Sequence, residues 1–316
     1  MTLTRRKFLQ RMYQVVVAAG ASPLLSFEEL LAADDEGLVR AGWSRPNLVW
    51  LQGSSCSGCT ISFLNIEQIT ILDFLTYFSR LLLQPNLSLT TGAQVPETLN
   101  QAAFADEPYI FVMEGAIPAG LPHACMMGGR PISEWVGLLA EKAAVTIAAG
   151  TCAVSGGVPQ MAGTLTGVES LGDFLKHQGI ETPLVNLPAC PLHPEHLIYT
   201  LLHYSRFETL PELDSAHRPQ RFFSHLVHEG CPRYAAFQAL DFARHLGEDG
   251  CLMELGCQGP VTYNDCHATG YNGNTNNCIR AGYPCIGCAG DLFPRTMLYH
   301  SHEDPRAKNG IMVKKS

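Results

Sequence analysis

The residues most able to do chemistry in this sequence are its twelve cysteines. Eleven of them, together with one histidine, fall into three groups of four. Four thiolate or imidazole ligands are enough to hold a metal ion or an iron–sulfur cluster. An even number of cysteines would also suit a disulfide framework in an exported protein. The number alone leaves both interpretations open, and the spacing has to decide between them.

The first group is Cys56, Cys59, Cys152 and Cys190. A C-x-x-C pair by itself also occurs in redox pairs and zinc sites. Here, however, the partners of this pair, Cys152 and Cys190, each follow their own short apolar segment, and glycine or other small residues lie beside them. Small neighbours let the backbone approach a bulky cluster and donate N–H groups to it. We therefore expect one four-cysteine cluster site in preference to two disulfides.

Two further groups lie in the C-terminal third of the chain. One comprises His228, Cys231, Cys251 and Cys257. The other comprises Cys266, Cys278, Cys285 and Cys288. Three cysteines with one histidine would suit zinc, or a cluster whose potential the histidine alters by removing a negative charge. Cys125 stands outside all three groups, and we expect it to be a small buried residue.

The first group can form only if the intervening chain brings distant cysteines together. Between residues 46 and 204, four apolar segments are typical of buried strands, at 47–53, 109–113, 144–148 and 183–187. Helical patterns lie between them, over 62–83 and 133–142. This alternation predicts an α/β fold with a doubly wound parallel sheet. Ligands of such sheets bind beyond the carboxyl ends of the strands, where the first group and Glu114 would lie.

The character of the chain changes after about residue 207, where strand signals fade and glycine, asparagine, histidine and cysteine become frequent. We predict a signal region at 1–34, an α/β domain at 45–205, and a loop-rich domain at 206–316 that depends on its cofactors for order. The formal net charge of -8 argues against nucleic acid as a partner.

The N-terminal segment predicts the compartment. Arg5 and Arg6 precede an apolar stretch over 13–27 and the small residues Ala32 and Ala33. This order is typical of a twin-arginine export signal, which carries folded proteins to the periplasm. Such a route suits clusters inserted before export and disfavours a disulfide framework. No later segment has 18 uninterrupted apolar residues, so we expect no membrane anchor after the signal.

Taken together, these motifs resemble the small subunit of nickel–iron hydrogenases, over residues 46 to about 294. The matching segments are 49–59, 112–118, 150–153, 187–191, 228–233, 251–266 and 281–288. The resemblance implies a flavodoxin-like first domain and a separate large subunit that carries the nickel–iron centre. Electrons from hydrogen would pass through three clusters to a cytochrome or a membrane acceptor.

The resemblance also assigns the groups. The first would hold a proximal [4Fe-4S] cluster facing the large subunit, and the second a distal [4Fe-4S] cluster near the surface. Cys266, Cys285 and Cys288 would hold the medial cluster. Many relatives have proline where Cys278 aligns and carry a medial [3Fe-4S] cluster. Cys278 therefore suggests a fourth iron and a medial [4Fe-4S] cluster.

Other departures from the family concern the proximal site. Gly58 and Gly157 stand where the oxygen-tolerant class has two additional cysteines, so its six-cysteine cluster is not expected. Ile61 stands where many relatives carry a glutamate. We suggest Glu114 as a subunit-interface or proton-relay residue, with a structural cap as the alternative.

Three other functions remain open at this stage. A hydrogen-sensing complex of the same family would usually act in the cytoplasm, which the export signal disfavours. A disulfide-rich exported binding protein would contain no iron. Another exported iron–sulfur electron carrier would lack a nickel-containing partner.

Overall fold

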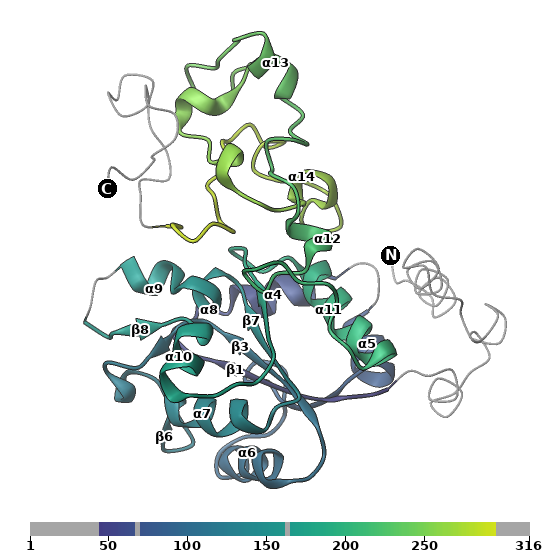
Figure 1. The fold of residues 1–316 in the computed structure, drawn as a ribbon, viewed down its shortest axis with the longest axis vertical. Helices are drawn as coiled ribbons and strands as arrows, with labels where there is room; N and C mark the ends of the chain where they lie inside the picture. Colours follow the sequence, from purple (N-terminus) through teal and green to yellow (C-terminus); the bar gives the residue numbers. More distant parts are fainter. Residues whose placement is uncertain (1–43, 67–69, 162–164, 295–316) are drawn as a thin grey trace, which may run out of the picture.

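The computed structural model describes residues 44–66, 70–161 and 165–294 (Figure 1). The predicted export signal and the last residues of the chain lie outside these ranges. Among the described residues, no helix has the length and apolar character that crossing a membrane requires.

A five-stranded parallel sheet forms the centre of the first part of the chain. Its strands are β1 (Asn47–Gln52), β2 (Arg80–Leu83), β3 (Tyr109–Glu114), β7 (Val145–Ala149) and β9 (Leu184–Leu187). They lie in the order β2-β1-β3-β7-β9, which is the flavodoxin-like order with its reversal between β1 and β3. The predicted doubly wound parallel sheet is therefore confirmed.

Helices cover both faces of this sheet (Figure 1). One face packs against α4 (Gly58–Leu64), α5 (Ile71–Tyr77) and α11 (Pro194–Phe207). The other packs against α6 (Gln94–Phe104), α7 (Ile132–Lys142) and α10 (Leu171–Gln178). Every residue of β3 and β7 is buried, as expected for strands covered on both sides.

Successive residues of β1 alternate between the two apolar cores. Trp50 packs with Phe63 and Phe74 on one face, whereas Val49 and Leu51 pack on the other. The strands also end level with one another, because Gln52 pairs with Glu114 and Glu114 pairs with Ala149. The residues that follow these strands therefore start from one edge of the sheet.

The predicted single helix over 62–83 is wrong. The segment contains α4, α5 and the edge strand β2. The backbone of Asn65 ends α4, and Thr70 begins α5 by accepting a hydrogen bond from the backbone N–H of Asp73 at 3.1 Å. Leu81 then pairs with Leu48 of β1. The predicted helix over 133–142 is confirmed by α7.

Short elements complete the first part of the chain. Two helical turns, α8 (Thr151–Ser155) and α9 (Gly157–Met161), follow β7. Two antiparallel pairs also belong to this part: β4 (Ile117–Pro118) with β8 (Val168–Glu169), which contacts α9, and β5 (Met126–Met127) with β6 (Arg130–Pro131), which contacts α7.

The chain after α11 has little regular structure and lies beyond the end of the sheet where α4 and α8 begin (Figure 1). Its helices are α12 (Gln220–Phe223), α13 (Tyr234–Gln238) and α14 (Cys266–Thr269), with 3-10 turns η2 (Leu252–Leu255) and η3 (Gly259–Val261). Its apolar core is small and includes Cys257 and Cys285 beside Leu252, Leu255 and Ile279. The predicted loop-rich character of this part is confirmed.

Candidate metal centres

The structure brings the four cysteines of the first group together at the carboxyl edge of the sheet. Cys56 and Cys59 follow β1, Cys152 lies in α8 after β7, and Cys190 follows β9. The pKa of the Cys59 thiol is raised well above its usual value, mainly by burial, then by Glu114 and the thiols of Cys190 and Cys152. Burial, followed by repulsion from Cys152, Cys288 and Cys56, raises the pKa of Cys190 to about 12.

Glycines keep the space around these sulfurs open. A Cβ atom on Gly58 would lie 3.1 Å from the Cys56 sulfur. A Cβ atom on Gly157, whose φ is +48°, would lie 2.8 Å from the Cys152 sulfur. The small residues noted in the sequence therefore form a cradle, and this cradle and its four thiols fit a bulky cluster.

Glu114 is buried directly behind this group, with 1% of its surface exposed. Its oxygens accept hydrogen bonds from the side chains of Trp50, Gln52, Ser55 and Thr60 and from the backbone N–H of Cys59. Every donor belongs to β1 or to the segment after it. This geometry favours the structural-cap alternative over the interface or relay role, because the carboxylate is enclosed and its oxygens already have partners.

The second group lies farther along the C-terminal part. Burial raises the pKa of Cys257, and the thiols of Cys231 and Cys251 raise it further, so these three cysteines are close together. A Cβ atom on Gly259 would lie 3.5 Å from the Cys257 sulfur and 3.6 Å from the backbone nitrogen of His228, so the backbone of the predicted histidine passes beside Cys257.

The His228 ring is suited to ligation. It packs edge-on against Tyr234 and Phe237, with ring centroids 5.1 and 4.6 Å away. Burial lowers its pKa, while Glu229 opposes this effect. A neutral imidazole has a free nitrogen lone pair at pH 7, which metal coordination requires.

The third group lies between the other two. Burial, then the thiols of Cys288 and Cys278, raise the pKa of Cys266, so the structure brings Cys278 close to these two cysteines. Cys285 joins them, because its pKa is raised by burial and then by Cys257, Cys288 and, more weakly, Cys266.

Contacts between the groups give their order in space. The backbone N–H of Cys285 donates to the Cys257 sulfur at 3.4 Å, which joins the third group to the second. The pKa of Cys288 is raised to about 11 by burial, and a backbone hydrogen bond from Cys190 opposes the shift. This contact joins the third group to the first. The spatial order is thus first, third, second, although the sequence order differs.

The other interpretations of the cysteines fit less well. All twelve cysteines lie in the described ranges and are free thiols, the opposite of a disulfide framework. Within the same ranges, no three His, Cys, Asp or Glu residues are arranged to hold a single metal ion. In an iron–sulfur cluster each thiolate binds a different iron, so the ligand sulfurs lie farther apart than they do around a single metal ion. Cys125 is half-buried, with its sulfur 3.9 Å from the Gln52 carbonyl oxygen.

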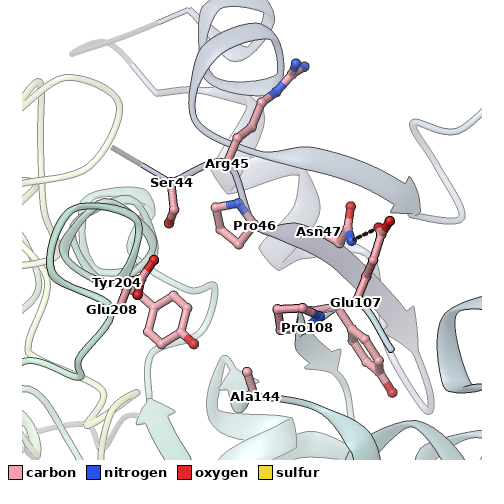
Figure 2. Close-up of a pocket in the computed structure, with 10 residues that line it drawn as sticks. Ser44, Arg45, Pro46, Asn47, Glu107, Pro108, Ala144, Tyr204 and Glu208 are labelled. Carbon is pink, nitrogen blue, oxygen red and sulfur yellow. Dashed lines mark hydrogen bonds between the residues drawn. The ribbon is translucent and has the colours of Figure 1, made fainter. Parts of the chain in front are cut away.

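A cavity of about 310 Å³ lies at the opposite edge of the sheet, where β1 and β3 begin (Figure 2). Asn47, Glu107, Tyr109 and Tyr204 are among the residues that line it. No cysteine lines this cavity, so it is separate from the candidate metal centres.

Sequence reasoning missed the residues that join the first and third groups. Tyr271 donates a hydrogen bond to the Pro191 carbonyl oxygen at 3.1 Å, and the Thr151 hydroxyl donates to the Cys288 carbonyl oxygen. These partners are 80 and 137 positions apart in the chain. A pattern of neighbouring residues in the sequence cannot predict contacts between segments this far apart.

Two family models match the chain. Residues 56–204 match the 20 kDa subunit of NADH ubiquinone oxidoreductase. Residues 223–300 match the C-terminal domain of NiFe/NiFeSe hydrogenase small subunits. Together the two matched ranges contain all twelve candidate ligands.

Curated relatives match over nearly the whole chain. The chain is 32% identical over 315 residues to the periplasmic [NiFeSe] hydrogenase small subunit of Desulfomicrobium baculatum, covering 93% of this chain and 97% of the relative. It is 33% identical over 293 residues to the periplasmic [NiFe] hydrogenase small subunit 1 of Nitratidesulfovibrio vulgaris, covering 91% and 89%.

Solved structures agree with the fold. A reduced, active form of the Ni-Fe-Se hydrogenase from Desulfomicrobium baculatum matches with a TM-score of 0.77 at 33% identity, covering 82% of this chain and 100% of that chain. The actinobacterial-type NiFe-hydrogenase from Ralstonia eutropha H16 matches with a TM-score of 0.75 at 29% identity, covering 87% of each chain.

Proposed function

This chain belongs to the family of nickel–iron hydrogenase small subunits, and we propose that its three groups of ligands hold three iron–sulfur clusters. A small subunit of this family is the electron-transfer half of a heterodimeric enzyme and pairs with the large nickel–iron subunit. When bound, each cluster would supply a site that takes up and gives away one electron at a time.

The spatial order of the ligand groups is the observation that carries this proposal. The first group is joined to the third through Cys190 and Cys288, and the third is joined to the second through Cys285 and Cys257. A continuous series of sites is what electron relay requires. We assign the first group to a proximal [4Fe-4S] cluster, the third to a medial [4Fe-4S] cluster and the second to a distal [4Fe-4S] cluster.

Exposed apolar side chains near the first group support its position against the large subunit. Ile61 and Leu64 on α4 are 57% and 40% exposed, and Val158 and Met161 on α9 are 51% and 55% exposed. Groups of large exposed apolar residues commonly mark protein interfaces. Ile61, which departs from the family's glutamate, thus supplies apolar contact area in this proposal.

Backbone N–H groups of the chain would tune the sites. Leu192 donates to the Cys59 sulfur at 3.3 Å, Arg233 to the Cys231 sulfur at 3.4 Å, and Gly287 to the Cys285 sulfur at 3.4 Å. Hydrogen bonds to ligand sulfurs stabilise negative charge and are one determinant of reduction potential. The cysteines with raised pKa values start as thiols, so their ligation would release protons.

The exit from the relay would be the second group. Tyr234, which packs on His228, is 38% exposed, so this end is close to solvent. We propose that an external acceptor, such as a cytochrome or a membrane acceptor, docks here.

We also propose that the chain acts in the periplasm after twin-arginine export. The two relatives described above are named as periplasmic, and Arg5 and Arg6 fit the signal. A division into domains at 45–205 and 206–316 remains part of the proposal, supported by the end of α11 at Phe207.

Metal analysis with EPR tests the function, on protein purified without oxygen together with whatever co-purifies. We expect about twelve irons per chain, in keeping with three [4Fe-4S] clusters. We also expect nickel in a larger partner and hydrogen-dependent reduction of the iron. Iron-free protein with thiols oxidised in pairs would overturn the proposal, and iron without a nickel partner would favour another electron carrier.

A further inference from the structure

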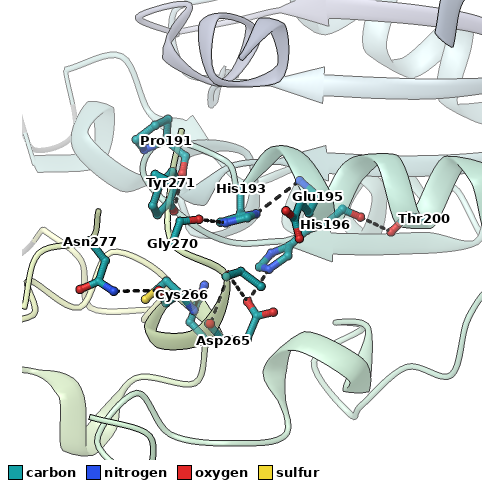
Figure 3. Close-up of polar contacts among 12 residues, drawn as sticks. Pro191, His193, Glu195, His196, Thr200, Asp265, Cys266, Gly270, Tyr271 and Asn277 are labelled. Atoms are coloured by element: carbon teal, nitrogen blue, oxygen red, sulfur yellow. Dashed lines mark hydrogen bonds and ion pairs between the residues drawn. The ribbon is translucent and has the colours of Figure 1, made fainter. Parts of the chain in front are cut away.

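Two reciprocal hydrogen bonds join the loop after β9 to the loop after α14 (Figure 3). The Tyr271 hydroxyl donates to the Pro191 carbonyl oxygen at 3.1 Å, and His193 Nε2 donates to the Gly270 carbonyl oxygen. The rings of His193 and Tyr271 also contact each other, with centroids 4.8 Å apart. We call these four residues the loop clasp.

The loop clasp lies between two ligand groups. Pro191 directly follows Cys190 of the first group, and α14 begins at Cys266 of the third group. Burial raises the pKa of Tyr271 well above its usual value, and the thiols of Cys288 and Cys266 raise it further. The phenol therefore keeps its proton at neutral pH and remains a donor, close to sulfurs of the third group.

The imidazole of His193 is held in one tautomer. It is 1% exposed, and burial, with a smaller effect of His196, lowers its pKa to about 4. The neutral ring accepts a hydrogen bond from the backbone N–H of Glu195 at Nδ1, at 3.3 Å. Its single proton is therefore on Nε2, where it is used for Gly270.

A second contact joins the helix that follows the first loop, α11, to the residue that precedes α14. His196 stacks on His193 with ring centroids 4.7 Å apart, and its Nε2 lies 2.7 Å from Asp265 Oδ1. Asp265 immediately precedes Cys266 (Figure 3). The side chain of His196 is fully buried and also stacks on Phe222, so this contact is fixed by packing.

We propose that His193 and Tyr271 are positioning residues for electron transfer, which fix the separation of the first and third ligand groups through the loop clasp. This inference rests on the proposed function, because it concerns the step between the proximal and medial sites. Functional groups are held to a fraction of an ångström by packing and hydrogen bonds from the surrounding residues. The Tyr271 hydroxyl also links the backbone beside Cys190 to the third group through a single side chain.

Four variants of the full heterodimer test the inference. Tyr271→Phe and His193→Leu each remove one donor of the loop clasp, whereas His193→Gln keeps an N–H that can reach Gly270. Tyr109→Phe is the matched control, because the buried Tyr109 hydroxyl donates to the Leu139 carbonyl oxygen at 2.6 Å but lies where β3 begins, away from the cysteines.

Three readouts are needed: iron content, the EPR splitting caused by magnetic interaction between neighbouring clusters in the reduced enzyme, and hydrogen exchange over residues 266–271. Tyr271→Phe and His193→Leu should keep full iron but change the splitting. Their loop should exchange about fivefold faster, as expected for the loss of one hydrogen bond. His193→Gln and Tyr109→Phe should match the wild type in splitting and in exchange over this loop.

Two results would overturn different claims. Full iron with unchanged splitting and exchange in Tyr271→Phe and His193→Leu would remove the positioning role and leave the proposed function intact. Wild-type protein without iron would instead remove the cluster assignment, and the inference with it.

Discussion

The carboxylate of Glu114 accepts a hydrogen bond at 3.1 Å from the backbone N–H of Cys59, a residue 55 positions earlier in the chain. The bond connects the end of β3 to a candidate ligand at the start of α4. Because Thr60 and Trp50 donate to the same carboxylate, one buried acceptor orders the whole segment that carries Cys56 and Cys59.

Replacing Glu114 with Gln should destabilise this segment. The new amide brings an N–H group to face N–H groups that can only donate, those of Cys59 and Thr60 at one oxygen position and of Trp50 and Gln52 at the other. A buried donor left unpaired costs about 1–3 kcal/mol. We expect a lower free energy of unfolding and a reduced iron content. Glu107→Gln is the control, because Glu107 is exposed and contacts Asn47 at 3.1 Å, so its effect should stay within about 0.5 kcal/mol.

The same variant separates a cap from a proton relay. A cap predicts that those Glu114→Gln molecules that retain iron turn over hydrogen normally. Fully loaded, stable protein with greatly reduced turnover would instead support the relay.

Removing a ligand of the first group should cost one cluster. Cys190→Ser should lower the iron content by about four atoms per chain, since one [4Fe-4S] cluster is lost. Hydrogen-dependent reduction of an external dye should fall to background, because the relay is interrupted. Cys125→Ser, which changes a half-buried thiol outside the groups, should keep full iron and normal dye reduction. A Cys190→Ser protein with wild-type iron and activity would contradict the assignment.

In the proposed assignment, Cys278 decides whether the medial cluster has three or four irons. Its thiol contributes to the raised pKa values of Cys266 and Cys288, so it is close enough to join them. Cys278→Pro should give about eleven irons in place of about twelve, together with a [3Fe-4S] EPR signal. If the wild type already shows that signal, and the substitution leaves it unchanged, Cys278 is not a ligand.

The second group predicts a measurable effect on potential. Replacing His228 by Cys exchanges a neutral ligand for a thiolate, and the added negative charge should lower the potential of the distal site. A redox titration followed by EPR would measure the shift. His225→Ala is the control, since His225 lies nearby with a 77% exposed side chain and should leave the potential unchanged.

Two glycines separate backbone strain from crowding at the first group. Both Gly157 and Gly179 have positive φ, so alanine at either should cost about 1–2 kcal/mol. A Cβ on Gly157 would also lie 2.8 Å from the Cys152 sulfur, whereas Gly179 has no atom within 4 Å of that position. Gly157→Ala should therefore be the more destabilising in urea unfolding, and only Gly157→Ala should lose iron. Equal destabilisation of the two variants, with full iron in both, would show that the site tolerates the added Cβ atom.

Apolar runs were sufficient to predict four of the five strands, because a strand buried on both faces is nearly continuous in valine, leucine and isoleucine. The run Leu81-Leu82-Leu83 continues the helical pattern before it, so the sequence alone predicts a helix where the structure has β2. Thr70 and Asp73 form a capping signal, which indicates that a new helix starts after Thr70. Use of this signal divides the predicted helix at the position where α5 begins.

The candidate site was predictable to a different degree. Cysteine spacing and the strand ends were enough to predict the first group, since parallel strands deliver their following residues to one edge. The contacts of Tyr271 with Pro191 and of His196 with Asp265 were not predictable. They join segments 80 and 69 positions apart, and their partners are set by how the two parts of the chain pack.

The order of the strands has a consequence for biosynthesis. The ligands of the first group follow β1, β7 and β9 in the chain. Of the strands in this sheet, β7 and β9 are the last to be synthesised. A nascent chain that ends before β9 offers at most three of the four thiols, and it offers them on an incomplete sheet. Delivery of the proposed proximal cluster would therefore have to wait until the chain has been synthesised past Cys190, because the order of the strands places the last ligand of this group after the last strand of the sheet.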